Sequence, residues 1–287
     1  MDYYGRFILG GHSSDEWGMS ISGAGTYSYP RRARELVSIP GRSGALIRDL
    51  GYYENVDISY NITILENFEQ NIRAFMNFLQ SQTGYIRLED TYHPDVYRMV
   101  VSTKDVKVDA IKPDQGMSYK GGNFVLTLNC KPQAYLKEGE KVALTITEAG
   151  TYTWHNKYES YPLIRIKKTR LTDSCLVTMR PIKGDPFEDN ARVTPRYNAC
   201  FSTDSTSVEN IATFDCEKKI IYGIEENTIF YGNQALTGIE YYLKNNYGTG
   251  TEILYGQALP AFRARDITVI VEGTPEKVEI TPQWWMI

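Results

Sequence analysis

The sequence lacks the cysteine patterns that form disulfide frameworks or common zinc sites. Its four cysteines, Cys130, Cys175, Cys200 and Cys216, include no close pair and no C-x-x-C spacing. This arrangement excludes the common zinc motifs and gives no basis for a disulfide framework. We therefore expect buried free thiols in a reducing compartment.

Long hydrophobic runs are also missing. No stretch approaches the roughly eighteen apolar residues of a membrane-spanning helix, and the N-terminus has no apolar core long enough for a signal peptide. We expect no membrane insertion, and we expect the protein to be made in the cytoplasm and to stay there unless it leaves as part of a larger particle.

The chain has no excess of positive charge. Its net charge is −4, with 15 Lys and Arg against 17 Asp and Glu in residues 1–140, and 16 against 18 in residues 141–287. Neither half has the basic character of a nucleic-acid-binding protein, so we expect no sequence-specific nucleic-acid binding. One local cluster stands out: Arg31, Arg32, Arg34, Arg42 and Arg48. It is either a solvated surface paired with carboxylates such as Glu35 and Asp49, or a contact patch for another subunit or a tube.

Catalytic and cofactor motifs are absent as well. The sequence contains no G-x-x-x-x-G-K-[ST], G-x-G-x-x-G, H-E-x-x-H or G-x-S-x-G pattern, and His12, His93 and His155 lie far apart. Acidic pairs such as Glu89-Asp90 cannot be catalytic dyads, because neighbours on a strand face opposite ways. We expect no enzymatic activity, no cofactor and no metal. A glycoside hydrolase remains the less favoured alternative.

What the chain does have is tyrosine and period-two alternation. There are 22 tyrosines, a residue that suits half-buried sheet faces and protein interfaces. Residues 56–65 alternate apolar and polar side chains, which predicts a long antiparallel strand with one buried face. Another strand is expected near 97–109.

One segment follows a helical period instead. Phe68, Ile72, Phe75, Met76 and Leu79 form a single apolar stripe, which predicts a helix over residues 67–81. Asn67 and Gln70 are spaced as an N-cap and its capping box, and Gly84 lies just past the expected end.

The length of 287 residues favours two domains. A Pro followed by charges and Gly near 131–142 marks the boundary, so we expect domains at 1–140 and 141–287. The fold class is mainly β, with an N-terminal α+β domain that contains the one helix and a C-terminal β-sandwich. Strands in the second domain are expected near 141–147, 162–167, 175–180, 218–223, 228–231, 251–255, 266–272 and 277–281. Residues 184–212 are expected to form a long loop or an insertion.

The segment Ile39-Pro40-Gly41-Arg42-Ser43-Gly44 precedes the long strand. Without a phosphate-loop pattern, Gly41 and Gly44 are best explained by a turn that needs positive φ.

Three stretches together resemble the distal tail proteins of long-tailed (siphovirus) phages that infect Gram-positive bacteria. The first comprises residues 13–19 (SSDEWGM) and 35–44 (ELVSIPGRSG). The second comprises 156–166 (NKYESYPLIRI) with 215–222 (DCEKKIIY), and the third is 278–285 (VEITPQWW). The family terminus often has Arg where this chain has Gln283.

This resemblance implies an N-terminal domain that closes a ring, expected to be a hexamer, as a hub at the end of the tail tube. It also implies a C-terminal galectin-like sandwich acting as an arm. The implied partners are further copies of the chain, the major tail tube protein, the tail-associated spike or lysin protein, and baseplate or receptor-binding proteins. The implied location is the virion tail tip, assembled in the host cytoplasm, with DNA passing through the ring.

Candidate ring-interface or turn residues follow from these patterns. They are Ile39, Pro40, Gly41, Arg42, Val56, Ile58, Tyr60, Ile62 and Ile64. Trp284 and Trp285 are candidate arm contacts, and adjacent strand positions predict that one faces inward and the other outward. These tryptophans, with Trp154, also leave open a carbohydrate-binding module, although His155-Asn156-Lys157 does not reproduce the galectin His-x-Asn-x-Arg pattern.

Overall fold

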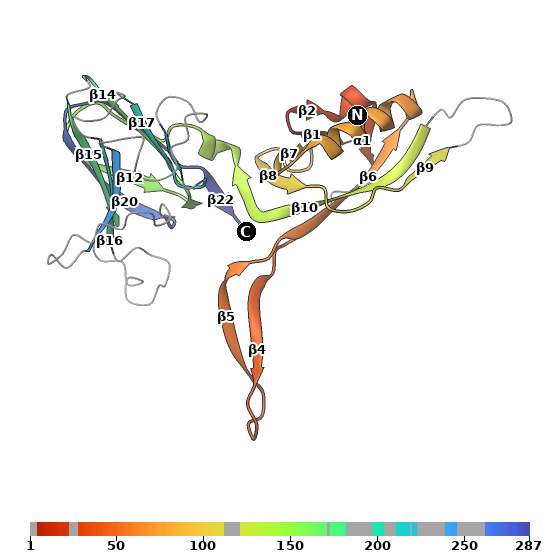
Figure 1. Cartoon of the computed structure of the whole chain (residues 1–287), viewed down its shortest axis with the longest axis horizontal. Coiled ribbons are helices and arrows are strands. Elements are labelled where there is room, and N and C mark those ends of the chain that lie inside the picture. Colours follow the sequence, from red (N-terminus) through yellow and green to blue (C-terminus); the bar gives the residue numbers. More distant parts are fainter. Residues whose placement is uncertain are drawn as a thin grey trace. The chain divides into compact units, whose positions relative to one another are not determined.

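The computed structural model describes residues 5–22, 28–111, 121–170, 173–181, 197–203, 211–218, 220–222, 239–245 and 262–287 (Figure 1). The chain divides into two compact units. The first contains Met1–Tyr135 and Ile287, and the second contains Leu136–Met286. The division falls a few residues before the boundary expected from the sequence. Within the described residues, no helix has the length and hydrophobicity needed to cross a membrane.

The first unit is an antiparallel sheet with one helix packed on it. Strands β10, β8, β7, β1 and β2 follow one another in that order, while β6 pairs with β10 and β3, and β9 pairs with β10. The bounds are β1 Phe7–Leu9, β2 His12–Ser13, a 3-10 helix Ser14–Trp17, β3 Met19–Ser22, β4 Arg32–Ser38, β5 Ala45–Tyr53, β6 Val56–Ile64, α1 Phe68–Ser81, β7 Ile86–Asp90, β8 Val96–Val101, β9 Val108–Ile111 and β10 Gly121–Leu136.

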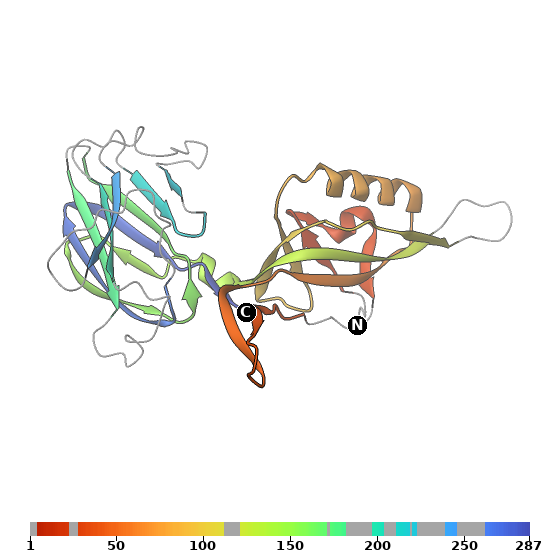
Figure 2. The same ribbon diagram turned by 60° about the horizontal axis from the view of Figure 1, so that its bottom comes forward.

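Helix α1 confirms the predicted helix, and Figure 2 shows it lying across the sheet. Its stripe packs into the core, with Phe68, Phe75 and Leu79 buried. The predicted capping box is wrong. Asn67 has φ of 48°, in the left-handed region, and its side chain makes no capping hydrogen bond. The helix is therefore held by its apolar face rather than by its first turn.

Strand β6 confirms the predicted alternation. Ile58, Tyr60, Ile62 and Ile64 are buried, while the side chains between them are exposed or half-buried. β6 pairs with β10 along nine residues, from Val56 opposite Cys130 to Ile64 opposite Gly122. The single strand expected near 97–109 is wrong, because β8 ends at Val101 and β9 begins at Val108.

The second unit is a β-sandwich. One sheet has the order β11-β21-β14-β17-β18 and the other β12-β20-β15-β16-β19, and β13 pairs with β22. The bounds are a 3-10 helix Lys137–Glu140, β11 Leu144–Ile146, β12 Gly150–Asn156, β13 Glu159–Ser160, β14 Leu163–Lys168, β15 Cys175–Pro181, β16 Tyr197–Thr203, β17 Ile211–Asp215, β18 Ile220–Tyr222, β19 Ile239–Asn245, β20 Arg265–Gly273, β21 Pro275–Thr281 and β22 Trp284–Met286.

The core of the sandwich takes every second residue from both sheets. Ile164 and Ile166 of β14 meet Val269 and Val271 of β20 in one buried cluster. The mainly β fold expected from the sequence is confirmed. Of the long loop or insertion expected over 184–212, the reading as a loop without strands is wrong in part, because β16 lies inside that range. The strands expected at 228–231 and 251–255 fall outside the described residues.

Candidate functional site: an exposed hairpin

Strands β4 and β5 form a hairpin that pairs with no other strand among the described residues (Figure 1). Its turn contains Ile39, Pro40, Gly41 and Arg42, and all four are exposed. Gly41 has φ of 79° and Gly44 has φ of 83°, so the predicted need for positive φ is confirmed. The Arg42 backbone N–H donates to the Ile39 carbonyl oxygen at 3.2 Å.

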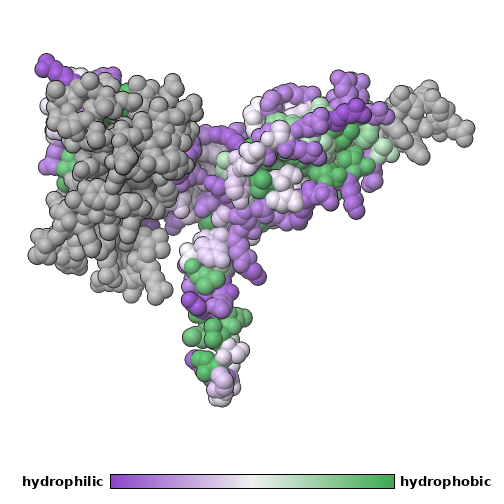
Figure 3. Space-filling model, in the orientation of Figure 1, coloured by the Kyte–Doolittle hydropathy of each residue, from purple (hydrophilic) through white to green (hydrophobic). Residues whose placement is uncertain are grey.

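The hairpin exposes large apolar side chains. Leu36 is 69% exposed and Ile47, its partner across the strands, is 61% exposed. Val37 and its partner Leu46 are 38% and 48% exposed. In Figure 3 the projecting hairpin shows hydrophobic patches between hydrophilic ones. Large apolar side chains left exposed in this way make the hairpin a candidate interaction surface.

Ion pairs along the hairpin account for most of the arginine cluster. Arg31 contacts Glu54 at 2.8 Å, Arg32 contacts Asp49 at 2.7 Å, and Arg48 contacts Glu35 at 3.4 Å. The expected pairing with Glu35 and Asp49 is thus confirmed. A hydrogen bond from the Gly51 backbone N–H and the Arg32 guanidinium lower the pKa of Asp49. In the described part of the chain, the side chains of Arg34 and Arg42 make no hydrogen bond or ion pair.

The interface role expected for the β6 residues needs correction. Ile58, Tyr60, Ile62 and Ile64 are buried in the core of their own unit, and Val56 packs against that core. The four buried side chains are covered by their own chain and leave little surface for a neighbour, whereas Val56 is half-buried. The alternation correctly identified one buried face, but that face packs within the unit rather than between subunits.

Trp284 and Trp285 are both buried, at 4% and 8% exposure. The expectation that one of them faces outward is wrong. Trp284 donates its indole N–H to Asn156 Oδ1 at 2.6 Å, and the Trp285 ring stacks on Tyr161 with centroids 5.6 Å apart. Trp154 is buried as well. None of the three offers a face on which a sugar could stack, so the carbohydrate-binding alternative loses the residues that motivated it.

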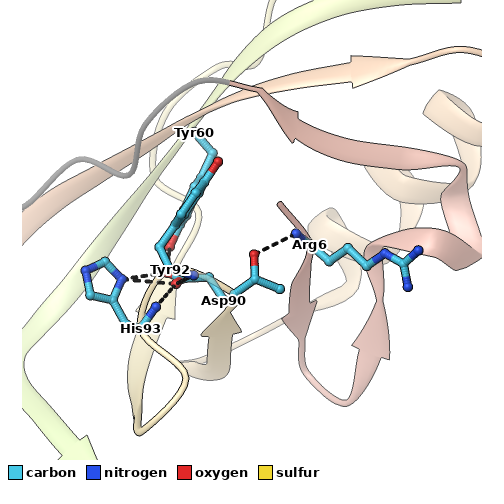
Figure 4. A network of polar contacts seen from close by, with 6 residues as sticks. Arg6, Tyr60, Asp90, Tyr92 and His93 are labelled. Carbon is cyan, nitrogen blue, oxygen red and sulfur yellow. Dashed lines mark hydrogen bonds and ion pairs between the residues drawn. The ribbon is translucent and has the colours of Figure 1, made fainter. Parts of the chain in front are cut away.

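The polar network around Asp90 holds the chain in place where it leaves strand β7 (Figure 4). Asp90, at the end of β7, accepts the Tyr60 hydroxyl at 2.6 Å and the backbone N–H groups of Tyr92 and His93. The His93 ring lies 3.0 Å from Asp90 Oδ1, and the Arg6 backbone N–H donates to Thr91 Oγ1. Burial, followed by the Asp90 carboxylate, raises the pKa of Tyr60 far above its usual range.

The remaining candidates for chemistry are dispersed. His12 pairs with Glu16 and His155 with Asp266, both at exposed positions. Among the described residues, no three His, Cys, Asp or Glu side chains are grouped as a metal site would require. Two further acidic pairs in the sequence, Glu188-Asp189 and Glu225-Glu226, fall outside the described residues.

The cysteines are buried thiols where the structure describes them. Cys130, Cys175 and Cys216 are buried and form no disulfide, as expected, and the side chain of Cys200 lies outside the described residues. Burial raises the pKa of Cys130 to about 12 and that of Cys175 to about 11. Both are therefore protonated at neutral pH and poor nucleophiles.

The exposed apolar residues of the hairpin were missed at the level of sequence. The available signal was a pair of apolar dipeptides, Leu36-Val37 and Leu46-Ile47, placed symmetrically about the glycine turn. An apolar dipeptide puts one side chain on each face of a strand. This pattern differs from the alternation of a strand that covers a core.

No family model matches the sequence, and no curated protein matches it. The fold, however, is similar to a solved structure: the crystal structure of the SPP1 Dit (gp 19.1) protein, described as a paradigm of the hub adsorption apparatus in phages that infect Gram-positive bacteria. The similarity covers 99% of each chain with a TM-score of 0.58 and 12% sequence identity. This chain therefore has the fold of a phage distal tail hub protein, and the resemblance drawn from its sequence is confirmed at the level of fold.

Proposed function

We propose that the chain is a structural protein of a phage tail tip. Copies join head to tail through the first unit into a closed ring of six, which links the tail tube to the host-adsorption apparatus and leaves a passage for DNA. The second unit is an arm for spike, baseplate or receptor-binding proteins. The protein is assembled in the host cytoplasm and carried in the virion.

The observation that carries this proposal is the exposed apolar hairpin on a fold similar to a tail hub protein. An isolated two-stranded ribbon is marginally stable in water, so exposed Leu36 and Ile47 favour a partner. Head-to-tail contacts that close into a ring leave no such surface uncovered. No catalytic step is part of the proposed role.

The test is the mass of the purified full chain in solution. Mass photometry should detect a closed oligomer of six. The double substitution Leu36→Asp with Ile47→Asp should produce monomer with an unchanged circular dichroism spectrum, because charge placed in an apolar contact opposes association. The control is Val142→Asp, which changes an exposed apolar residue of the second unit and should leave the oligomer intact.

A wild-type chain that remains monomeric at every accessible concentration would contradict the proposal. If the hexamer persists unchanged in the double variant, the ring exists but the hairpin is not part of the contact between its subunits.

A further inference from the structure

The hydrogen-bonded ladder between β4 and β5 is interrupted near its base. Arg32 pairs with Tyr53 and Arg34 pairs with Asp49, so Ala33 alone lies opposite three residues of β5. Extra residues on one strand disrupt the ladder and bend the ribbon. The interruption divides the two strands into a base, from which the chain continues into β6, and an outer part that comprises residues 34–49.

The interruption lies at the point where β4 becomes exposed. Ala33 is only 1% exposed, whereas residues 34–38, which complete the strand, are all exposed. A two-stranded ribbon is marginally stable by itself, and the regular ladder is lost where residues are inserted. Without further contacts, the outer part would therefore pivot at the interruption.

One arginine bridges the interruption. Arg32 belongs to the base, and its Nε donates to Asp49 Oδ2 in the outer part at 2.7 Å. Its guanidinium carbon also lies 5.5 Å from the centre of the Tyr53 ring, and its NH1 lies 3.5 Å from the Tyr53 hydroxyl oxygen. Arg32 thus contacts both sides of the interruption at once.

The same carboxylate also holds the extra residues of β5. Asp49 Oδ1 accepts the Gly51 backbone N–H at 2.8 Å, while its Oδ2 accepts from Arg32. Gly51 has φ of 82°, a conformation that glycine adopts far more readily than other residues. Hydrogen bonds to a charged group are stronger than neutral ones. Asp49 therefore joins the inserted segment and the base to the outer part.

The two other ion pairs described in the hairpin do not bridge the interruption. Arg31 and Glu54 both flank the base, where the Glu54 backbone N–H also donates to the Arg31 carbonyl oxygen at 2.8 Å. Arg48 and Glu35 both belong to the outer part. These pairs join β4 to β5 on one side only, so they leave the angle between the base and the outer part free.

We propose that Arg32, Asp49 and Gly51 form a clamp that fixes the direction of the outer part in the single chain, before it meets any partner. The three are positioning residues: they set where the exposed side chains point and need not touch a partner themselves. The inference does not depend on the proposed ring, because every contact in the clamp lies within one chain. A segment ordered in advance loses less conformational entropy when it binds.

Single-molecule energy transfer on the full-length chain tests the clamp. Donor and acceptor dyes are attached to non-natural residues at Ser43, in the turn, and at Glu69, on the exposed side of helix α1. Only molecules with one donor and one acceptor are analysed, so each signal comes from a single chain. The donor lifetime in these molecules reports the spread of distances between the two dyes.

The wild type should show one narrow distance distribution. Arg32→Ala should broaden it by at least about twofold, because the outer part is then free to pivot. Gly51→Ala should change the mean distance, since the added Cβ meets nothing within 4 Å but disfavours the positive φ. Arg48→Ala is the matched control: it removes an arginine and an ion pair from the hairpin without touching the clamp, and should leave the distribution unchanged.

Three results would overturn the clamp. A wild-type distribution as broad as that of Arg32→Ala would mean that the outer part already pivots freely. A narrow distribution that Arg32→Ala does not change would mean that the backbone alone fixes the direction. Equal broadening by Arg32→Ala and Arg48→Ala would mean that loss of charge, and not loss of the bridge, matters. Circular dichroism of each variant confirms that the fold is retained.

Discussion

Trp284 and Trp285 form a matched pair of buried indoles that differ in one hydrogen bond. The Trp284 N–H donates to Asn156 Oδ1, whereas the Trp285 indole nitrogen finds no acceptor among the described residues. Replacing Trp284 by Phe leaves the buried Asn156 oxygen without its donor, so we expect the unfolding free energy of the second unit to fall by about 1–3 kcal/mol. Urea denaturation followed by circular dichroism measures this loss.

Trp285→Phe is the control. It removes similar ring volume and keeps the stacking on Tyr161, but it breaks no hydrogen bond. It should therefore cost less than Trp284→Phe. Equal losses in the two variants would show that ring volume, and not the hydrogen bond to Asn156, determines the effect.

The buried carboxyl of Asp215 should make the stability of the second unit depend on pH. Burial raises the pKa of this carboxyl. The backbone N–H groups of Lys218 and Glu217 and the Lys218 ammonium favour the charged form and oppose the shift, but burial outweighs them. The folded state then holds the proton more tightly than the unfolded state. The free energy of unfolding should fall as pH rises from the ordinary aspartate range through the raised pKa.

Asp215→Asn tests this contribution. Asparagine keeps an oxygen for the two backbone N–H groups, at 3.0 and 2.9 Å, and removes the buried charge. In the wild type, the urea midpoint should fall as pH rises through the acidic range, and in the variant this fall should be absent. At neutral pH the variant should be at least as stable as the wild type. A variant with the wild-type pH profile would show that Asp215 does not contribute to it.

For the two tryptophans, the sequence predicted the direction of the side chains but not their burial. Alternation correctly implied that Trp284 and Trp285 point to opposite sides of their strand. It could not reveal that Asn156 and Tyr158 cover one side and Tyr161 the other. Burial depends on neighbours distant in sequence, and no local pattern contains them.

At the scale of elements, Gly122 allows β10 to approach the start of helix α1. A Cβ at this position would overlap the Phe68 ring and lie 3.0 Å from the Asp109 carbonyl oxygen. We expect Gly122→Ala to destabilise the first unit by about 1–3 kcal/mol, because a packed ring must move. Thermal or urea unfolding of the purified variant measures the change.

Gly84→Ala is the matched control for that substitution. A Cβ at Gly84 meets nothing within 4 Å, and its φ lies outside the positive range. We expect stability within about 0.5 kcal/mol of the wild type. A Gly122→Ala protein as stable as this control would mean that the strand and helix shift apart at little cost.

Elements with one buried face could be predicted from sequence, and elements without one could not. Helix α1 and strand β6 each bury a single face, so their periods of 3.6 and two are visible in the order of residues. The hairpin exposes apolar residues on both faces and therefore breaks the alternation. The single strand expected over 97–109 and the long loop or insertion expected over 184–212 failed in part for a related reason: their irregular composition gave no clear period.

At the scale of the whole molecule, the order of motifs predicted the fold correctly, but the candidate contact residues chosen on β6 lie in or against the core of their own unit. The β6 side chains were chosen because they are apolar, and their burial removes them from any interface. Interface residues of a ring are those that the single chain leaves uncovered. The sequence does not distinguish an apolar side chain that its own core covers from one that only a neighbour covers.

Residues 31–54 of the hairpin contain five arginines against three carboxylates, whereas the rest of residues 1–135 contains nine Lys and Arg against twelve Asp and Glu. These opposite net charges predict how the proposed ring responds to salt. Raising the salt concentration from about 0.1 M to about 1 M shortens the screening length from about 10 Å to about 3 Å. Attraction between a positive hairpin and an acidic neighbour should weaken, so mass photometry should detect more monomer at high salt.

Arg34→Glu should weaken association at low salt and reduce its salt dependence. Arg170→Glu, at an exposed position in the second unit, should do neither. Association that strengthens steadily with salt would mean that the apolar faces alone hold the copies together.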